Sequence, residues 1–475
     1  MNQIEKIVWF RRDLRLDDHD ALLSALSSLS KQKTILPVFI FDPRQVSSSN
    51  QYRSAPSLSF LVESLRDLDQ QLRGHNSRLF VFHGLPHTIF SQLVPQLPAL
   101  RSFHCHLDCT PFSQTRDEAV QEVCQKHDIA WEGSWGELMF PPKTILTGSG
   151  TIYQKFTPFY NKAKKHSLPK PRSLPKNPSF ASSSLSFSQE SKPNWEEEYV
   201  PALPDDFTIL HHGGRTAFLK RWNSVKELKD YNKTRNYPEE STTEWSAALK
   251  YGLVSIREAI AQLERTVGLE NGIARQLYFR EFYYQVMVAH PQQLQTNRPG
   301  KNKAFLEKWE GYSYGKPNKK WLKAWKEGKT GFPIIDAGMR QMLHTGFMHN
   351  RVRMLCASFL NKDLGIDWRI GEQYFAEKLY DYDPTQNNAG WQSTCGMGAS
   401  ALDWYRVMNP WTQTKEYDPD AAYIKEWVPE LHEVPIETIF NWDAAKESIN
   451  QYPLPIVSHD ERRQLYLAKT KQQLP

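Results

Sequence analysis

The stretch Ile7-Val8-Trp9-Phe10 decides the fold class, because a short and wholly apolar run of this kind is typical of a buried strand. Helical apolar spacing follows in residues 20–29, and a second strand-like run follows in residues 34–40. The alternation continues with strands expected at 78–82 and 102–106 and helices at 57–72 and 113–126. Strands that alternate with helices indicate βαβ units, so we predict an α/β N-terminal domain with a doubly wound parallel sheet over residues 1–135.

The rest of the chain has a different character. Residues 136–206 are rich in Pro, Ser and Lys, and we expect them to form an interdomain linker that crosses the surface. From residue 207 to residue 475 the apolar spacing is helical, most clearly in 256–263, 273–288 and 339–360, and hairpin signals are missing. The sequence therefore predicts a larger, all-α C-terminal domain over residues 207–475.

The composition narrows the function classes. The 475 residues carry a net charge of +6, which is compatible with a polyanionic partner, and they include 15 Trp, a residue type that packs cores but also stacks on bases and flavins. No apolar run approaches the roughly 20 residues that a membrane span needs, so we expect no membrane partner. Five cysteines are too few for a disulfide framework and favour a reducing compartment. We expect a cytoplasmic protein, associated with the nucleoid if bacterial, or a nuclear one if eukaryotic.

Common catalytic motifs are missing from the sequence. Residues 104–109 contain two His, two Cys and one Asp, but their alternation fits a strand better than a closed zinc site, so we predict no metal. Neither of the common phosphate-binding glycine loops is present, and no Gly-x-Ser-x-Gly nucleophile motif occurs. The chemistry must therefore be sought in less regular groups of polar residues.

The most informative of these groups lies in the helical half. Asn350 and Met354 are four residues apart, so on a helix they share a face, and Arg353 is adjacent to that face. Further polar residues follow at Asp381, Asp383, Asn387 and Asn388. Two interpretations fit: a site for a planar ligand rich in hydrogen bonds, and a structural ion pair between helices.

Two other groups leave a similar choice. A hydroxyl cluster of Thr242, Thr243 and Ser246 opens a predicted helix and suits either phosphate binding or an N-cap. Gln276 and Arg280 share a helical face within an aromatic stretch, which suits either contacts with bases and phosphates or core packing.

Several ordered motifs resemble the photolyase/cryptochrome family, most closely the photolyases that repair cyclobutane pyrimidine dimers. They are VWFRRDLRL at 8–16, YQKFTPF at 153–159, GKTGFPIIDAGMRQ at 328–341 and MHNR at 348–351. The resemblance, from Val8 to about Lys469, implies a monomeric deoxyribodipyrimidine photo-lyase that acts on damaged DNA. In such an enzyme, excited reduced FAD passes an electron to a lesion that has flipped out of the duplex.

Other functions stay open. A blue-light photoreceptor cryptochrome is one alternative, and a photolyase with altered lesion preference, such as one for six-four photoproducts, is another. A flavoprotein without photochemistry, or a single-strand binder, is a third hypothesis. An absorption spectrum and a repair assay under blue light would separate these classes.

The resemblance also implies roles for individual residues. Those that would hold FAD are Tyr231, Thr242, Thr243, Ser246, Gln276, Arg280, Asn350, Arg353, Asp381, Asp383 and Asn387, with Asn387 facing flavin N5. Those that would contact DNA are Arg235, Gln276, Phe279, Arg351, Met354 and Trp391. Catalytic roles in repair or electron transfer would fall to Trp391, Trp368, Asn387, Gln276, Asn350 and Met354.

The sequence departs from the family pattern at the lesion pocket. Gln276 stands where a Glu is usual, and Phe279 and Ser393 each stand where a Trp is usual. Gln keeps a hydrogen-bond acceptor but removes the charge. These three residues imply an altered lesion preference.

It departs from the pattern in the electron-transfer chain and the antenna site as well. The outer Trp of the chain would fall near Gly315, where Tyr314 or Trp321 could replace it. Thr110 stands at the acidic position that contacts a folate antenna, so the resemblance disfavours folate. A deazaflavin or flavin antenna, or no antenna, stays open.

Overall fold

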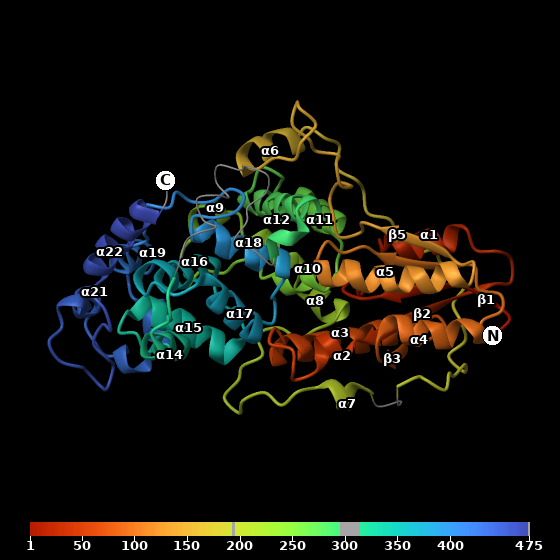
Figure 1. Ribbon diagram of the computed structural model, residues 1–475, viewed down its shortest axis with the longest axis horizontal. Helices are drawn as coiled ribbons and strands as arrows, with labels where there is room; N and C mark the ends of the chain where they lie inside the picture. The colour runs from red at the N-terminus through yellow and green to blue at the C-terminus, as the bar shows by residue number, and fades with distance from the viewer. Residues whose placement is uncertain (192–194, 295–313, 474–475) are drawn as a thin grey trace.

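The N-terminal part is built on one parallel sheet. The computed structural model describes residues 1–191, 195–294 and 314–473 (Figure 1). Five strands pair in the order β3-β2-β1-β4-β5, and every pair is parallel. They are β1 (Ile4–Phe10), β2 (Thr34–Phe41), β3 (Phe80–His83), β4 (Ser102–His106) and β5 (Ala130–Ser134). This sheet confirms the predicted α/β class.

Helices cover both faces of the sheet because successive strand residues point to opposite sides. Val8 and Phe10 pack with α1 (Asp20–Ser27) and α3 (Ala55–Arg73), whereas Ile7 and Trp9 pack with α4 (Pro86–Leu93) and α5 (Pro111–Lys126). The sequence pattern did not predict β5. None of its five residues is buried, so this edge strand carries no apolar alternation.

The segment between the sheet and the helices is largely exposed but buries a few of its side chains. It contains α6 (Phe156–Ala163) and α7 (Trp195–Tyr199). Single β-bridges pair Phe180 with Ile35 and Glu190 with Phe82, and the Phe180 ring is buried. The segment therefore packs along β2 and β3, and its Pro and Ser content concealed these contacts.

The C-terminal part consists of helices, as predicted. In chain order they are α8 (Arg215–Lys220), α9 (Tyr231–Thr234), α10 (Ser246–Lys250), α11 (Ile256–Thr266), α12 (Gly272–Ala289), α14 (Lys319–Glu327), α15 (Pro333–Thr345), α16 (Asn350–Ser358), α17 (Trp368–Lys378), α18 (Pro384–Thr394), α19 (Pro410–Tyr417), α20 (Ala422–Trp427), α21 (Ile436–Phe440) and α22 (His459–Gln473). Among the described residues, no helix combines the length and the apolar character needed to cross a membrane.

The apolar pattern at 339–360 is divided between two helices, α15 and α16. Gly346 follows α15 in the left-handed conformation (φ 67°), which ends the helix. His349 then caps α16, since its Nδ1 accepts from the Arg351 backbone N–H at 3.2 Å. This break places Asn350 in the first turn of the new helix.

Buried polar contacts join the sheet domain, and the segment that follows it, to the helices. Glu281 of α12 accepts from the backbone N–H groups of Met139 (2.8 Å) and Phe140 (3.1 Å). Arg12, which follows β1, donates to Tyr284 Oη (2.7 Å) and lies 3.2 Å from Asp383 Oδ2. The two parts of the chain therefore fix the entry to α18 together.

Candidate functional site

An ion pair between half-buried Arg353 and buried Asp381 joins α16 to the segment before α18. The Arg353 side chain of α16 donates from Nη2 to Asp381 Oδ2 at 2.9 Å and from Nε to the Met348 carbonyl at 2.7 Å. Asp381 is 5% exposed, and its other oxygen, Oδ1, is buried without a hydrogen-bond partner. A buried carboxylate oxygen in this state is an acceptor for a ligand.

The Asn350–Met354 face lies on the same helix as Arg353. Asn350 Nδ2 is 3.8 Å from Met354 Sδ, as the four-residue spacing predicts. Arg351 donates to Asn236 Oδ1 at 2.8 Å, and its guanidinium lies over the Tyr417 ring. Asn350 is exposed, whereas Arg351 is half-buried. The start of α16 thus offers amide, thioether and cationic groups close to the ion pair.

Asn387 of α18 faces a carboxyl group that the sequence did not single out. Its Nδ2 donates to Glu372 Oε1 at 3.0 Å and reaches the Glu372 backbone carbonyl at 3.5 Å. Glu372 is 2% exposed, and burial raises its pKa to about 7 despite hydrogen bonds from Asn387, Tyr382 and Tyr52. The sequence signal was a lone Glu within the otherwise apolar buried face of α17.

Two of the predicted cofactor residues, Asp383 and Arg280, form hydrogen bonds within the protein. Asp383 Oδ1 caps α18 by accepting from the backbone N–H groups of the next helical turn, and its Oδ2 accepts from Tyr284. Arg280 donates to the Glu137 carbonyl at 2.8 Å. Their contact with FAD stays a prediction.

The hydroxyl cluster before α10 does not cap that helix. Trp245 occupies the N-cap position, and no side-chain cap bond forms there. Thr243 Oγ1 accepts only a long bond, 3.4 Å, from the Trp245 N–H, and no hydrogen bond ties Thr242 or Ser246 hydroxyls to another described residue. These hydroxyls are therefore available to a ligand, and Tyr231 lies on α9.

The residues expected on the lesion side differ in how far other protein groups already occupy them. Gln276 makes only a weak bond, 3.4 Å, to the Gly272 carbonyl, so its amide is available. Phe279 is stacked on Phe156 of α6, with ring centroids 3.4 Å apart and planes 13° from parallel. One face of Phe279 is thus covered by protein. Arg235 forms the C-cap of α9.

The predicted electron-transfer residues lie in a compact aromatic region. Trp391 of α18 is 3% exposed, and Trp368 of α17 is 1% exposed. Trp391 packs directly on the α17 backbone, since a Cβ on Gly371 would lie 2.3 Å from Trp391 Cη2. The Trp325 ring is also close, with centroids 6.3 Å apart. Tyr314 and Trp321, the two candidates for the outer position, are half-buried against the same cluster.

A second candidate site lies at the carboxyl edge of the sheet. A cavity of about 550 Å³ opens there, lined by residues that follow β1, β2 and β4, including Arg12, Asp42 and Asp108. The strand order reverses between β1 and β4, and parallel sheets bind ligands at such switch points. Trp9 and Phe112 supply aromatic walls, and Arg11 Nη2 and Arg53 Nε are buried without hydrogen-bond partners.

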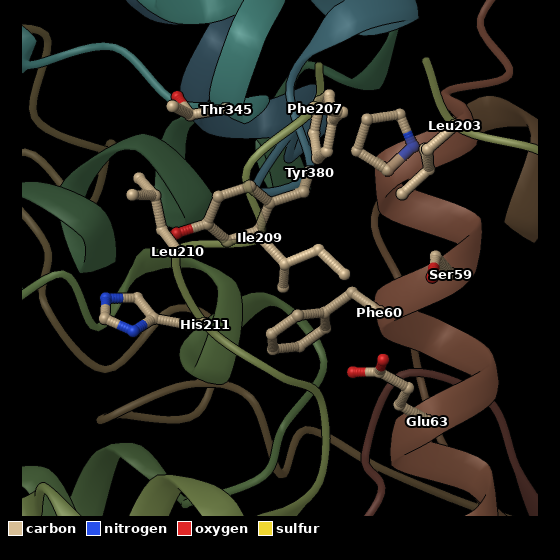
Figure 2. A pocket seen from close by; sticks show the side chains of 11 residues that line it. Ser59, Phe60, Glu63, Leu203, Phe207, Ile209, Leu210, His211, Thr345 and Tyr380 are labelled. Carbon is tan, nitrogen blue, oxygen red and sulfur yellow. The ribbon is translucent and has the colours of Figure 1, made fainter. Parts of the chain in front are cut away.

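A third hollow is far smaller. Figure 2 shows it between α3 and the segment that leads to His211, lined mainly by Phe60, Phe207, Ile209 and Tyr380. Its volume of about 20 Å³ has room for about one water molecule. It is therefore packing space beneath the connecting segment and not a cofactor site.

His106, from the segment with metal-capable atoms, lies in a buried cluster with Asp13 and His19. His19 Nε2 is 2.9 Å and His106 Nδ1 is 3.2 Å from Asp13 Oδ2. The other ring nitrogens accept backbone N–H groups, His19 Nδ1 from Leu22 (3.1 Å) and His106 Nε2 from Ala21 (3.4 Å). The three atoms that face one another, Asp13 Oδ2, His19 Nε2 and His106 Nδ1, are buried without a hydrogen-bond partner and lie close enough together to hold a metal ion, so the absence of a metal stays a prediction.

Comparison with known proteins shows which family the chain belongs to. The chain is 31% identical over 484 residues to a deoxyribodipyrimidine photo-lyase of Alkalihalophilus pseudofirmus, covering 98% of this chain and 97% of that relative. The chain belongs to the photolyase/cryptochrome family. Photolyase family models match twice, as "DNA photolyase" over residues 6–178 and as "FAD binding domain of DNA photolyase" over residues 273–472.

Two more comparisons extend this result. A crystal structure of an archaeal photolyase from Sulfolobus tokodaii with two FAD molecules superposes with a TM-score of 0.85 at 34% identity, covering 98% of this chain and 100% of that one. A cryptochrome DASH of Gloeobacter violaceus is 30% identical over 90% of this chain and 86% of that relative. The predicted family, fold class and photolyase enzyme class are confirmed.

The residues present suit FAD, the predicted cofactor, which the FAD-binding domain confirms. The unpartnered Asp381 Oδ1 provides an acceptor for an N–H of the flavin ring. The Thr242 and Ser246 hydroxyls would provide donors for the phosphates. The chemistry of these side chains therefore suits a flavin nucleotide, and their contact with FAD stays a prediction.

Replacing Trp391 tests the electron-transfer assignment in this photolyase. We expect Trp391→Phe to slow photoreduction of bound FAD by at least an order of magnitude, because phenylalanine is far harder to oxidise than tryptophan. Trp411→Phe, on α19, is the control and should leave the rate unchanged. The rate is followed by flavin absorbance under blue light with an added thiol. Equal rates in wild type and Trp391→Phe would show that electrons reach the flavin by another route.

Proposed function

We propose that this photolyase repairs cyclobutane pyrimidine dimers in DNA by light-dependent electron transfer from reduced FAD. The observation that carries the proposal is the arrangement around α16. There, the Arg353–Asp381 pair with its free acceptor oxygen lies beside the amide and thioether of Asn350 and Met354. In this proposal one helix serves both the flavin and the lesion.

The protein residues have separate tasks in this proposal. Those that hold the cofactor are Tyr231, Thr242, Thr243, Ser246, Gln276, Arg280, Asn350, Arg353, Asp381, Asp383 and Asn387. When bound, reduced FAD supplies the electron that opens the cyclobutane ring under light and accepts it back afterwards. The side chains orient the flavin and exclude water from it.

The lesion side uses a second set of residues, namely Arg235, Gln276, Phe279, Arg351, Met354 and Trp391. The lesion must leave the base stack to reach a flavin held among helices, and a damaged pair costs least to extrude. Cationic side chains such as Arg235 and Arg351 would contact phosphates, so binding should weaken as salt rises and depend little on sequence. We also propose that the protein binds DNA as a monomer in the compartment that holds the genome.

Lesion preference is the point at which a second candidate function has support. Phe156 covers one face of Phe279, so this ring can stack on a lesion only through its other face. Gln276 also offers an amide where the family pattern has a carboxylate. A photolyase for six-four photoproducts, or a light sensor, would tolerate these changes.

The experiment that tests the proposed function is turnover of matched oligonucleotides that carry either a cyclobutane dimer or a six-four product, with and without blue light. Faster repair of the dimer supports the proposal, whereas turnover of only the six-four product, or of neither, contradicts it.

We further propose that the cavity at the sheet edge holds a phosphate-bearing flavin or deazaflavin antenna. The unpartnered nitrogens of Arg11 and Arg53 suit a phosphate, and Trp9 and Phe112 suit a flat ring. The Thr110 hydroxyl, at the position expected to contact folate, is instead used to cap α5.

Flavin stoichiometry tests the antenna proposal. With excess FAD, we expect a second flavin per chain in the wild type and its loss in Arg53→Ala, while the first flavin is retained. Arg73→Ala, an exposed residue at the far end of α3, is the control. The flavin is released with acid and measured against protein concentration. A wild-type ratio that never exceeds one flavin per chain, with FAD, FMN or a deazaflavin, would contradict the proposal.

A further inference from the structure

Asn387 can face a flavin with either its amide N–H groups or its carbonyl, and the two orientations have opposite chemical effects. Oxidised flavin N5 accepts a hydrogen bond, whereas reduced N5–H donates one. An amide oxygen aimed at N5 therefore favours the reduced form, and an amide N–H aimed at N5 favours the oxidised form. The group that fixes the amide orientation influences the redox balance of the cofactor.

Glu372 is in a position to fix that orientation. Its Oε1 lies 3.0 Å from Asn387 Nδ2, and its backbone carbonyl lies 3.5 Å from the same nitrogen. The ionised carboxylate and the backbone carbonyl both accept hydrogen bonds. The amide group that Asn387 turns towards them is therefore its nitrogen, which can donate. Among the described residues, no donor is bonded to Asn387 Oδ1, so this oxygen is left for a ligand.

The surroundings of Glu372 contain donors but no cation. Tyr382, which precedes α18, donates to Oε1 at 3.2 Å, and Tyr52, from the segment between α2 (Pro43–Val46) and α3, forms a further hydrogen bond. No ion pair of Glu372 occurs within the parts of the chain that the structure describes. Arg369, the cation closest along α17, is bound to Asp367. The charge of Glu372 is therefore balanced only by neutral donors, which makes it sensitive to pH.

We propose that the Glu372 carboxylate is a positioning residue, which holds the Asn387 amide with Oδ1 towards flavin N5 and so stabilises the N5-protonated, reduced cofactor. The inference rests on the proposed function, because that function places Asn387 at N5. A protonated Glu372 would lose this hold, since its O–H could donate to a flipped Asn387 Oδ1. The Asn387 N–H groups would then be free to face oxidised N5.

The pH dependence has a definite sign. Burial raises the pKa of Glu372 to about 7, so the carboxyl is ionised above this pH and protonated below it. Tyr52, with a pKa raised to about 12, and Tyr382, with a pKa well above its usual value, stay neutral throughout. The charged groups that act on these phenols are Arg369, held by Asp367, and Asp383, held by Arg12. Retention of reduced flavin should therefore improve as pH rises through about 7.

The test uses the full chain loaded with FAD and reduced by light, followed by reoxidation in air between pH 5.5 and 8.5. In the wild type we expect reoxidation to be about 5-fold slower at the upper end, the value of roughly one hydrogen bond. Glu372→Gln keeps the side-chain shape without the charge and should remove this pH dependence. Glu377→Gln, a partly exposed residue on the same helix, is the matched control and should behave like the wild type.

Two further measurements separate positioning from simple support of the fold. Infrared difference spectra with ¹³C-labelled asparagine should show the Asn387 carbonyl band shifting on flavin reduction in the wild type but not in Glu372→Leu. Tyr52→Phe removes a donor to the ionised carboxylate, so it should move the pH midpoint upward. Tyr405→Phe, an exposed ring elsewhere, should not.

The inference is overturned if Glu372→Gln retains the wild-type pH profile, or if the carbonyl band shifts equally in Glu372→Leu. In either case FAD binding and dimer repair by the wild type would leave the proposed function intact. A wild-type protein that binds no FAD would instead overturn the proposed function, and this inference with it.

Discussion

Arg353→Ala is expected to weaken FAD binding by roughly 100-fold, because it leaves the buried Asp381 carboxylate without its cation. Asp381 is 5% exposed and forms an ion pair with Arg353 at 2.9 Å. Breaking such a pair from one side costs about 3–5 kcal/mol. A flavin ring placed against an unpaired anion cannot recover this loss. Binding is measured by titrating the apoprotein with FAD and following flavin fluorescence.

The double variant separates loss of charge balance from loss of fold. Arg353→Ala combined with Asp381→Asn removes both charges, so it should recover thermal stability without recovering FAD affinity. Arg353→Lys keeps the charge but not the second hydrogen bond to the Met348 carbonyl, so it should lose affinity by only about 10-fold. FAD binding by Arg353→Ala at wild-type affinity would show that the flavin lies elsewhere.

Asp336→Ala is expected to lower the free energy of unfolding by about 3–5 kcal/mol. Asp336 is fully buried at the start of α15. Its Oδ1 accepts from the Thr330 N–H (2.8 Å) and hydroxyl (2.7 Å), and its Oδ2 accepts from the Gly331 N–H (2.9 Å) and the Tyr452 hydroxyl (2.6 Å). Alanine would leave all four donors buried and unsatisfied.

Urea unfolding, followed by the fluorescence of the helical part, measures this effect. Tyr452→Phe removes only one of the four donors and should cost about 1 kcal/mol. A loss of stability about three to five times larger in Asp336→Ala than in Tyr452→Phe would indicate that the unsatisfied donors are the cause. An unchanged urea midpoint for Asp336→Ala would show that solvent reaches these donors in the folded protein.

The parts of the fold that follow from local pattern were predictable. The apolar run at Ile7 gave β1, and the four-residue spacing of Asn350 and Met354 gave a shared face that the structure brings together. The edge strand β5 was missed because it buries no residue, and the break at Gly346 was missed because the apolar spacing continues across it.

The parts of the site that depend on distant contacts were not predictable from pattern. Arg12 meets Asp383 across 371 positions of the chain, so no periodicity could show that this carboxylate joins the sheet domain to α18. Glu372 on α17 bonds to Asn387 on α18, and it matters because burial raises its pKa. The sequence does not show which side chains are buried. Phe279 was expected to face a lesion, but its stacking on Phe156 depends on how the segment after the sheet folds back.

The most direct test is the loss of cyclobutane dimers from a thymine-dimer oligonucleotide, incubated with the purified FAD-loaded protein under blue light and in the dark. Recovery of absorbance at the wavelength of intact thymine measures repair. We predict many turnovers per protein in the light, none in the dark, and none in the light after removal of FAD. Dimers that persist in the light with FAD bound would contradict the account.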